Sequence, residues 1–448
     1  ITKLSLESQY SDSEEIYARL IDYIDENLIK DSYFNKRLYK YMLLDDQITG
    51  AQVCMLLFEQ NIIDGTDEEK QAVQSGSKSA YNFMLEKIEN LDITPAQLAL
   101  DPCSGSCVVT DTRTGEVLAL VTYPGYDNNR LTNSIDSDYY NKIYYDLSQP
   151  MWNYATQQLS APGSTFKMVS AATALENNVV GLNETITCKG TWDTLSPPAR
   201  CWIAPNGSHG PLDIAGAIEH SCNYFFYEVG YRLSRNNGVY DSDTGLEKLA
   251  YYADQFGLSD KSGVEISESA PKVSDFDAIR SAIGQGTNNY STVGLARYVT
   301  TVANSGNCYN LSLLSKATDA DGNLIADYTP TLRNTVDLKQ STWDAIHQGM
   351  RKVVEDKDYY KDLTIQVAGK TGTAQENRKR ANHALFVCYA PYEQPQIAIA
   401  TRIAFGYASD YAAQVTKDIV KYYFKLEDES SLITGTAEST NVVQSAGD

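Results

Sequence analysis

Runs of apolar and β-branched residues occur at two distant places in the chain. Residues 106–111 and 116–123 flank a turn at 112–115 and predict an antiparallel hairpin. Between this hairpin and the C-terminus, apolar residues at helical spacing predict helices, among them 164–175 and 292–304. Three further runs predict strands near the C-terminus: 364–368, 384–389 and 396–403. This order favours an α+β fold, in which helices flank a five-stranded antiparallel sheet and also form a mostly helical subdomain.

The segments on either side of this stretch contain no chemical motif. Residues 1–100 carry many charges and tyrosines, and helix-start signals such as Thr49 predict a helical linker or pedestal. An amphipathic helix is expected at 411–426, and the Ser, Thr and Gly of 430–448 predict a disordered C-terminal tail. The expected organisation is a linker, a large domain over 101–429 and a tail.

Composition narrows the classes of function. The 448 residues are 42% hydrophobic and 21% charged, which is typical of a globular protein. Lys and Arg number 37 against 58 Asp and Glu, so the net charge is −21, which argues against a nucleic-acid binder. No apolar run reaches the length of about 18 residues that a membrane span needs. Because the sequence begins at Ile1, we expect an upstream anchor to be missing from it.

A serine and a lysine three residues apart are the first candidates for chemistry. Pro162 and Gly163 make a turn before Ser164, which would begin a helix among outward-pointing N–H groups. Lys167 would share that helix face, and burial would push its amine toward the neutral, basic form. The alternative is that Ser164 only caps the helix and Lys167 is an exposed charge.

A second candidate pair is Ser221 and Asn223. Two residues apart in a loop, both side chains can face one cleft. The serine could relay a proton and the asparagine could bind a substrate amide. A simple turn or helix end is the alternative explanation.

The third candidate segment is 370–373, Lys-Thr-Gly-Thr, at the end of the strand expected from Thr364. Gly372 would permit close approach of a ligand or another backbone. An extended substrate could then lie beside the strand, with the N–H groups of Thr373 and Ser164 forming an oxyanion hole. The alternative is a plain edge strand.

The three segments together are far more specific than each alone. Ser-x-x-Lys, Ser-x-Asn and Lys-Thr-Gly, in this order, are the signature of penicillin-recognising serine acyltransferases. The chain resembles the transpeptidase domain of a class B penicillin-binding protein over about residues 101–426. Further segments support the resemblance: 114–119, 123–124, 127–129, 162–167, 209–210, 283–286, 383–387 and 389–391.

The resemblance implies a serine D,D-transpeptidase that cross-links peptidoglycan stem peptides ending in D-Ala-D-Ala and is acylated and inhibited by β-lactams. It implies Ser164 as the nucleophile and Lys167 as its base. Ser221 would pass a proton to the leaving amine, Asn223 would hold the donor amide, and Lys370 would support the Ser221 hydroxyl. The substrate-binding residues would be Thr371, Gly372 and Thr373, of which the two threonines hold the donor carboxylate.

The resemblance also implies a setting. The chemistry would need no cofactor, and a membrane glycosyltransferase would be the partner enzyme. An N-terminal helix outside this sequence would anchor the protein at the extracytoplasmic face of the bacterial cell membrane. Whether it serves elongation, division or sporulation is open.

Two positions depart from the family pattern. Where the family often has Asn-Arg-Ala, this chain has Asn153-Tyr154-Ala155, so an inter-domain arginine contact is open. Cys388 stands where the family usually has a small residue.

A metal site is a separate hypothesis. Two cysteines, a carboxylate and an imidazole precede the Ser-x-Asn motif and could complete a tetrahedral structural zinc site: Cys188, Asp193, Cys201 and His209. A Cys188–Cys201 disulfide and two reduced thiols are the alternatives.

Two other functions share the motif set. A serine β-lactamase uses it, but such enzymes are usually shorter and need a base for the deacylating water, for which the sequence offers no candidate. A β-lactam sensor or an idle scaffold would carry the motifs without turnover. Long-lived or short-lived labelling by a penicillin distinguishes these possibilities.

Overall fold

The computed structural model describes residues 12–28, 30–98, 100–146, 148–194, 196–204, 206–376 and 380–434. The described residues form two compact units, 12–94 and 95–434. Within these described ranges, no helix combines the length and apolar character needed to span a bilayer. The domain bounds expected at 101 and 429 stay predictions.

The first unit is helical. Its elements are α1 (Ser13–Tyr23), a π-helical turn (Ile24–Leu28), α2 (Ser32–Leu44), α3 (Gly50–Glu59), α4 (Asp67–Ser75) and α5 (Ala80–Glu89). The helix start expected at Thr49 is confirmed, because its side chain and that of Gln52 close a capping box. Phe58, Val73 and Phe83 are buried and form the packed centre of α3, α4 and α5.

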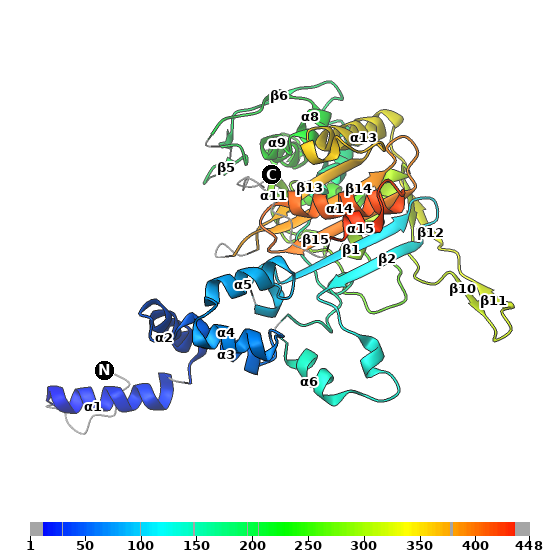
Figure 1. Ribbon diagram of the computed structural model, residues 1–448. Coiled ribbons are helices and arrows are strands. Elements are labelled where there is room, and N and C mark those ends of the chain that lie inside the picture. The colour runs from blue at the N-terminus through cyan, green and yellow to red at the C-terminus, as the bar shows by residue number, and fades with distance from the viewer. Residues whose placement is uncertain are drawn as a thin grey trace. The chain divides into compact units, whose positions relative to one another are not determined.

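The second unit is built on one five-stranded antiparallel sheet, which confirms the predicted fold class (Figure 1). The strands are, in spatial order, β13 (Ala368–Ala374), β14 (His383–Ala390), β15 (Ile397–Ala404), β1 (Ser104–Asp111) and β2 (Val117–Tyr123). The strand expected over 364–368 instead begins at Ala368. Leu363 and Ile365 pack against the apolar cluster below the sheet without pairing, so their apolar character produced the early strand prediction.

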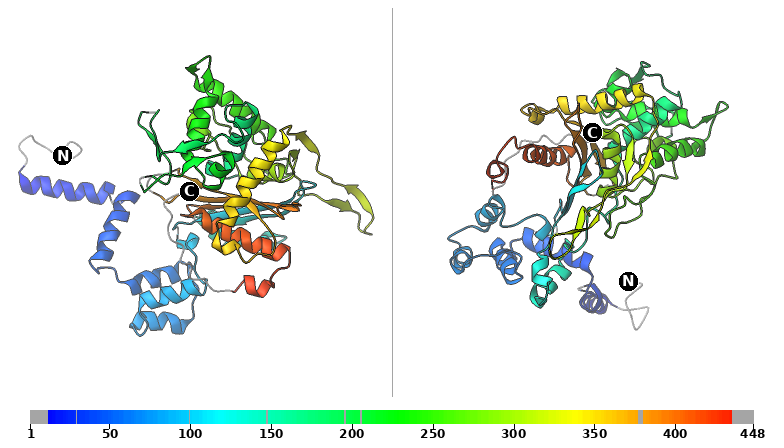
Figure 2. Two further views of the ribbon diagram at one scale, coloured as in Figure 1. Left: turned by 90° about the horizontal axis from the view of Figure 1, so that it is seen from above. Right: turned by 90° about the vertical axis from the view of Figure 1, so that its right-hand side faces the viewer.

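Helices cover both faces of this sheet (Figures 1 and 2). Helix α14 (Ser409–Tyr423) packs on one face against β14 and β15, over an apolar cluster that includes Val109, Phe386 and Ile399. Helix α12 (Thr292–Ala303) packs on the other face, where Val108 and Val387 lie. The side chains alternate between the two clusters as expected for strands buried on both faces.

The helical subdomain lies on the α12 side. Its main helices are α7 (Lys167–Glu176), α8 (Ile214–Glu219), α9 (Asn223–Leu233), α10 (Ser242–Gln255) and α13 (Gln340–Glu355). Lys370 of β13 stands in register with Val387 of β14 and Ala400 of β15. Since residues opposite one another share a face, Lys370 faces this subdomain.

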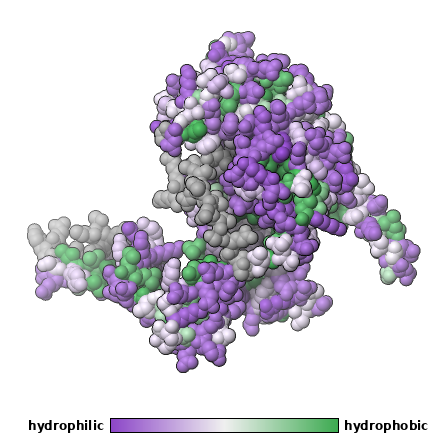
Figure 3. Space-filling model, turned by 45° about the horizontal axis from the view of Figure 1, so that its top comes forward, coloured by the Kyte–Doolittle hydropathy of each residue, from purple (hydrophilic) through white to green (hydrophobic). Residues whose placement is uncertain are grey.

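Smaller helices complete the unit: the 3₁₀ helices Ala96–Leu98, Asn128–Leu131, Gly163–Phe166 and Asp358–Tyr360, and the α-helices α6 (Ser137–Tyr145), α11 (Ala278–Ser281) and α15 (Glu429–Leu432). The remaining strands form two-stranded sheets: β3 (Ile186–Cys188) with β6 (Gly210–Leu212), β4 (Thr191–Trp192) with β5 (Ala199–Arg200), β7 (Arg235–Asn236) with β8 (Val239–Tyr240), β9 (Asn307–Tyr309) with β12 (Leu332–Thr335), and β10 (Lys316–Thr318) with β11 (Leu324–Asp327). The β10–β11 hairpin projects from the unit and exposes Leu324 and Ile325 (Figures 1 and 3). Of the expected tail, residues 430–432 belong to α15, and 435–448 lie outside the described residues.

Candidate active site

Ser164 lies in the 3₁₀ helix Gly163–Phe166, which continues directly into α7. The sequence predicts a helix from Ser164, and the structure makes its first turn tighter than an α-helix. Thr165 supports this turn by donating a hydrogen bond from Oγ1 to Pro162 O at 2.8 Å. Ser164 is 6% exposed and Lys167 is fully buried, so the lysine is not a surface charge.

Lys167 joins the first motif to the second. Its Nζ donates to the Ser221 backbone oxygen at 2.7 Å, to Ser221 Oγ at 3.1 Å and to Asn223 Oδ1 at 2.7 Å. Ser221 ends the α8 turn with φ +49° and is 4% exposed, and Asn223 then begins α9. The left-handed residue directs the chain so that both side chains of the motif reach the same amine.

Glycine lets the third motif pack against the first. A Cβ on Gly163, whose φ is +52°, would lie 2.5 Å from Thr373 O. A Cβ on Gly372 would lie 2.7 Å from Thr165 Cγ2. The close approach expected at Gly372 is therefore to the backbone and side chains beside Ser164. Any side chain at either glycine would push β13 away from the nucleophile.

Lys370 lies inside β13 rather than at the end of a strand. Its Nζ donates to the Thr371 backbone oxygen at 3.0 Å and to Thr371 Oγ1 at 3.2 Å. Lys370 and Thr371 are buried, whereas Thr373 is partly exposed. The structure thus brings Lys167, Ser221 and Asn223 into contact and packs Gly372 and Thr373 against the segment that carries Ser164, while Lys370 contacts Thr371 on the same strand. The individual roles of these residues stay predictions.

Residues that the motifs do not include support the nucleophile from behind. Tyr298 of α12 donates from its hydroxyl to Thr165 O at 3.1 Å, and the rings of Phe166 and Tyr290 stack with centroids 6.3 Å apart. Nothing in the local sequence distinguishes these residues from ordinary core positions, so only the tertiary contacts identify them.

A thiol-rich cluster lies next to the Ser-x-Asn motif. One ligand atom each of Cys188, Cys201, His209 and Cys222 lies within 4.8 Å of all the others. Cys201 Sγ is 3.6 Å from His209 Nδ1 and 4.0 Å from Cys222 Sγ. Hydrogen bonding with Cys222 lowers the pKa of Cys201, and hydrogen bonding with Cys188 and then with Cys201 raises the pKa of Cys222. This donor set fits a tetrahedral zinc ion.

The prediction of Asp193 as the fourth ligand is wrong. Trp192 of β4 is buried and donates from Nε1 to Glu228, whereas Asp193, the residue after β4, is exposed and lies outside the cluster. Cys222, the middle residue of Ser-x-Asn, takes its place in the cluster. All eight cysteines are free in the structure, so it contains no Cys188–Cys201 disulfide.

Comparison with known proteins identifies the family of this chain. The family model of the penicillin binding protein transpeptidase domain matches residues 105–421. The chain belongs to this family. It is 30% identical over 362 residues to the peptidoglycan D,D-transpeptidase MrdA of Haemophilus influenzae. The aligned region covers 72% of this chain and 53% of the relative. The Escherichia coli K12 protein of the same name is 27% identical over 359 residues, or 72% of this chain and 55% of the relative. The chain therefore spans about half the length of these relatives.

Solved structures of the family share this fold. Penicillin-binding protein 2 of Pseudomonas aeruginosa, in complex with WCK 5153, is 25% identical with a TM-score of 0.61, covering 75% of this chain and 76% of that one. Penicillin-binding protein A of Mycobacterium tuberculosis, as an imipenem acyl-enzyme, is 21% identical with a TM-score of 0.64, covering 81% and 87%. At this identity the second likeness concerns the fold alone.

Proposed function

We propose that the protein is a serine D,D-transpeptidase that cross-links peptidoglycan stem peptides through an acyl-enzyme on Ser164 and is acylated by β-lactams. The single observation that carries this proposal is the buried amine of Lys167, which follows Ser164 on one helix and contacts both Ser221 and Asn223. The names of the MrdA relatives support the peptidoglycan substrate.

The geometry suits a two-step acyl transfer. Ser164 Oγ attacks the carbonyl between the two D-alanines and gives its proton to Lys167, which must enter the step as the neutral amine. The carbon–nitrogen bond then breaks, and the proton passes through Ser221 to the departing D-alanine. An amine of a second stem peptide takes the acyl group and restores Ser164. Backbone N–H groups of Ser164 and Thr373 would stabilise the oxyanion.

The remaining residues would hold the donor strand. The hydroxyls of Thr371 and Thr373 would bind its terminal carboxylate beside the Lys370 ammonium, and Gly372 would keep the strand close to the nucleophile. Asn223 would exchange its contact with Lys167 for the donor amide. These steps use protein groups alone and need no cofactor.

We extend the proposal to the setting of the enzyme. A membrane glycosyltransferase would supply the glycan strands that carry the stem peptides, and the reaction would take place at the extracytoplasmic face of the membrane. The MrdA names support this setting through the peptidoglycan substrate.

Incubation with a fluorescent penicillin tests the function directly. We expect stoichiometric labelling that persists for many minutes, because no side chain is assigned to activate a deacylating water. Intact-mass spectrometry would show one penicilloyl adduct per chain. Rapid loss of the adduct would identify a β-lactamase instead, and a complete lack of labelling would favour a non-catalytic scaffold.

We also propose a structural zinc ion held by Cys188, Cys201, His209 and Cys222. Three thiol groups and one imidazole within 4.8 Å, all largely buried, support it. Because Cys222 lies between Ser221 and Asn223, such an ion would hold the Ser-x-Asn turn in place and take no part in the chemistry.

Metal analysis of protein purified without added zinc should find about one zinc ion per chain. Cys188→Ser should lose most of the metal, because one thiolate ligand is removed. Cys308→Ser is the matched control, since Cys308 is also buried but lies outside the cluster, and it should retain the metal. A wild-type protein without stoichiometric metal would refute the site.

A further inference from the structure

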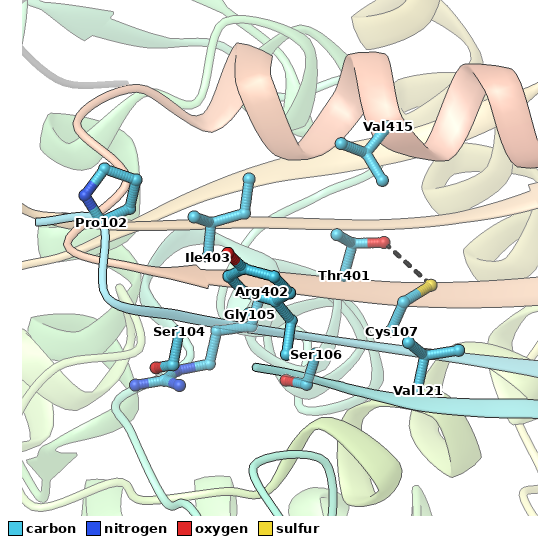
Figure 4. Close-up of a pocket in the computed structure, with 11 residues that line it drawn as sticks. Pro102, Ser104, Gly105, Ser106, Cys107, Val121, Thr401, Arg402, Ile403 and Val415 are labelled. Atoms are coloured by element: carbon cyan, nitrogen blue, oxygen red, sulfur yellow. Dashed lines mark hydrogen bonds between the residues drawn. The ribbon is translucent and has the colours of Figure 1, made fainter. Parts of the chain in front are cut away.

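A buried arginine lies on the sheet face that carries the nucleophile segment and is not used by the chemistry above. Arg402 of β15 is 2% exposed and stands opposite Leu385 of β14, which stands opposite Gly372 of β13. Since opposite residues share a face, Arg402 lies on the face against which the segment around Ser164 packs. Figure 4 shows its side chain on the side of the strands away from Val415 of α14.

One end of the guanidinium binds the loop that leads to the nucleophile, residues 152–162, here called the nucleophile loop. Arg402 Nε donates to Ser160 Oγ at 3.0 Å. Ser160 is fully buried, and its backbone exchanges hydrogen bonds of 3.0 and 2.9 Å with Tyr290. Only the segment 161–163 separates this anchored residue from Ser164, so a shift of Ser160 would be transmitted to the attacking oxygen.

The other end of the guanidinium reaches the end of β13. Arg402 Nη2 lies 3.4 Å from Nδ1 of His383, which begins β14 opposite Ala374. This Nδ1 also accepts from the Phe405 N–H at 3.1 Å, so the neutral ring carries its proton on Nε2. Nε2 lies 3.0 Å from Oε2 of Glu376, two residues beyond β13. Interaction with His383 lowers the pKa of Glu376, and the Arg402 charge adds to this effect. The two side chains approach within ion-pair distance, although among the described residues His383 Nε2 forms no aligned hydrogen bond.

Stability alone does not account for this arginine. Burial lowers the pKa of Arg402 to about 10, which reflects the cost of holding the charge away from water. Among the residues that the structure describes, its buried Nη1 has no hydrogen-bond partner. Apolar packing of the same volume is often at least as stable as a buried ionic group of this kind. A positional role explains why the charge is placed there.

The nucleophile loop supplies no arginine of its own. At position 154, where the family resemblance expects one, the chain has a tyrosine. The Tyr154 hydroxyl donates to the Ser148 backbone oxygen at 2.5 Å, and its N–H donates to Thr122 Oγ1 of β2 at 2.8 Å. The charged contact between this loop and the sheet therefore comes from the opposite partner, strand β15.

We propose that Arg402, His383 and Glu376 form a positioning network that holds the nucleophile loop and the end of β13 at a fixed separation and thereby sets the acylation rate of Ser164. The inference rests on the proposed acyl-transfer function. The attacking oxygen of Ser164 follows the nucleophile loop, whereas the Thr373 N–H belongs to β13, so the separation of these two segments sets their alignment. Small errors in such an alignment cost large factors in rate.

Arg402→Met tests the network, because it removes the charge and donors while keeping a long apolar side chain. With a fluorescent penicillin, the first-order acylation rate at saturation should fall about tenfold or more. The dissociation constant of the non-covalent complex should change less than about threefold. The Tm should not decrease, even though the acylation rate does, because apolar packing can replace the buried charge. Arg402→Lys, which keeps the charge, should recover part of the rate.

Arg333→Met is the matched control, because Arg333 is also largely buried and hydrogen-bonded, to Asp254 and Asn334, but contacts no residue of the network. It should lower the Tm and leave the acylation rate of the folded protein unchanged.

Ser160→Ala removes only the acceptor on the nucleophile loop and keeps the test valid if Arg402→Met does not fold. It should also slow acylation, and the double variant should be no slower than Arg402→Met alone. Wild-type rates in both single variants, or fully additive losses in the double variant, would overturn the inference. A wild-type protein that is not acylated at all would refute the proposed function instead.

Discussion

Ser164→Ala should abolish covalent labelling by penicillin. Removal of the nucleophilic oxygen leaves no atom to form the acyl-enzyme, so the acylation rate should fall by about four orders of magnitude or more. Because Ser164 and its replacement are nearly the same size, the Tm should change little. Intact-mass spectrometry after incubation with a β-lactam measures the adduct directly.

The control for this variant is Ser170→Ala. Ser170 lies on α7 and is also fully buried, but its hydroxyl donates to Ala282 O and faces no motif residue. It should lose some stability, of about 1 kcal/mol, and retain labelling. An adduct that forms on the Ser164→Ala protein at the wild-type rate would place the nucleophile elsewhere.

Lys167→Met should cause the second large loss. It removes the only amine that contacts both Ser221 and Asn223 in the described structure, and with it the proposed base, so acylation should slow by about three orders of magnitude. The buried oxygens of Ser221 and Asn223 also lose a donor, so the free energy of unfolding should fall by about 1–3 kcal/mol. Stopped-flow acylation and thermal unfolding measure the two effects separately.

Lys248→Met is a suitable comparison for Lys167→Met. Lys248 of α10 donates from Nζ to the Leu233 backbone oxygen at 3.0 Å and does not contact the motifs. Its replacement should affect the Tm and leave the acylation rate near that of the wild type. Near-normal acylation in Lys167→Met would exclude this lysine as the base.

Most of the sheet could be predicted because its strands alternate with turns that the local sequence specifies. The hairpin at 106–123 and the strands at 384–389 and 396–403 agree with β1, β2, β14 and β15. The fifth strand was predicted four residues too early, because apolar residues before Ala368 pack against the sheet without hydrogen bonding to it. Strand pairing depends on a partner, and the local pattern does not contain that partner.

The metal ligands show the same limit. Closeness in the sequence predicts Cys188, Cys201 and His209 as ligands, and it predicts Asp193 for the same reason. Asp193 follows directly after β4 and is exposed, whereas Cys222 enters the cluster from the turn between α8 and α9. Whether a nearby carboxylate or a more distant thiol completes the cluster is decided by the packing of the elements.

The sequence by itself determined the chemistry and its order along the chain: a serine and lysine on one helix, a Ser-x-Asn turn and a Lys-Thr-Gly strand, within an α+β fold. Residue type and short spacing encode these features locally. The tertiary structure alone decided that Lys167 contacts the second motif, that Gly163 lies against Thr373, and that Arg402 holds the loop before Ser164. Those contacts join segments that are far apart in the chain, and they form only when the sheet and helices pack together.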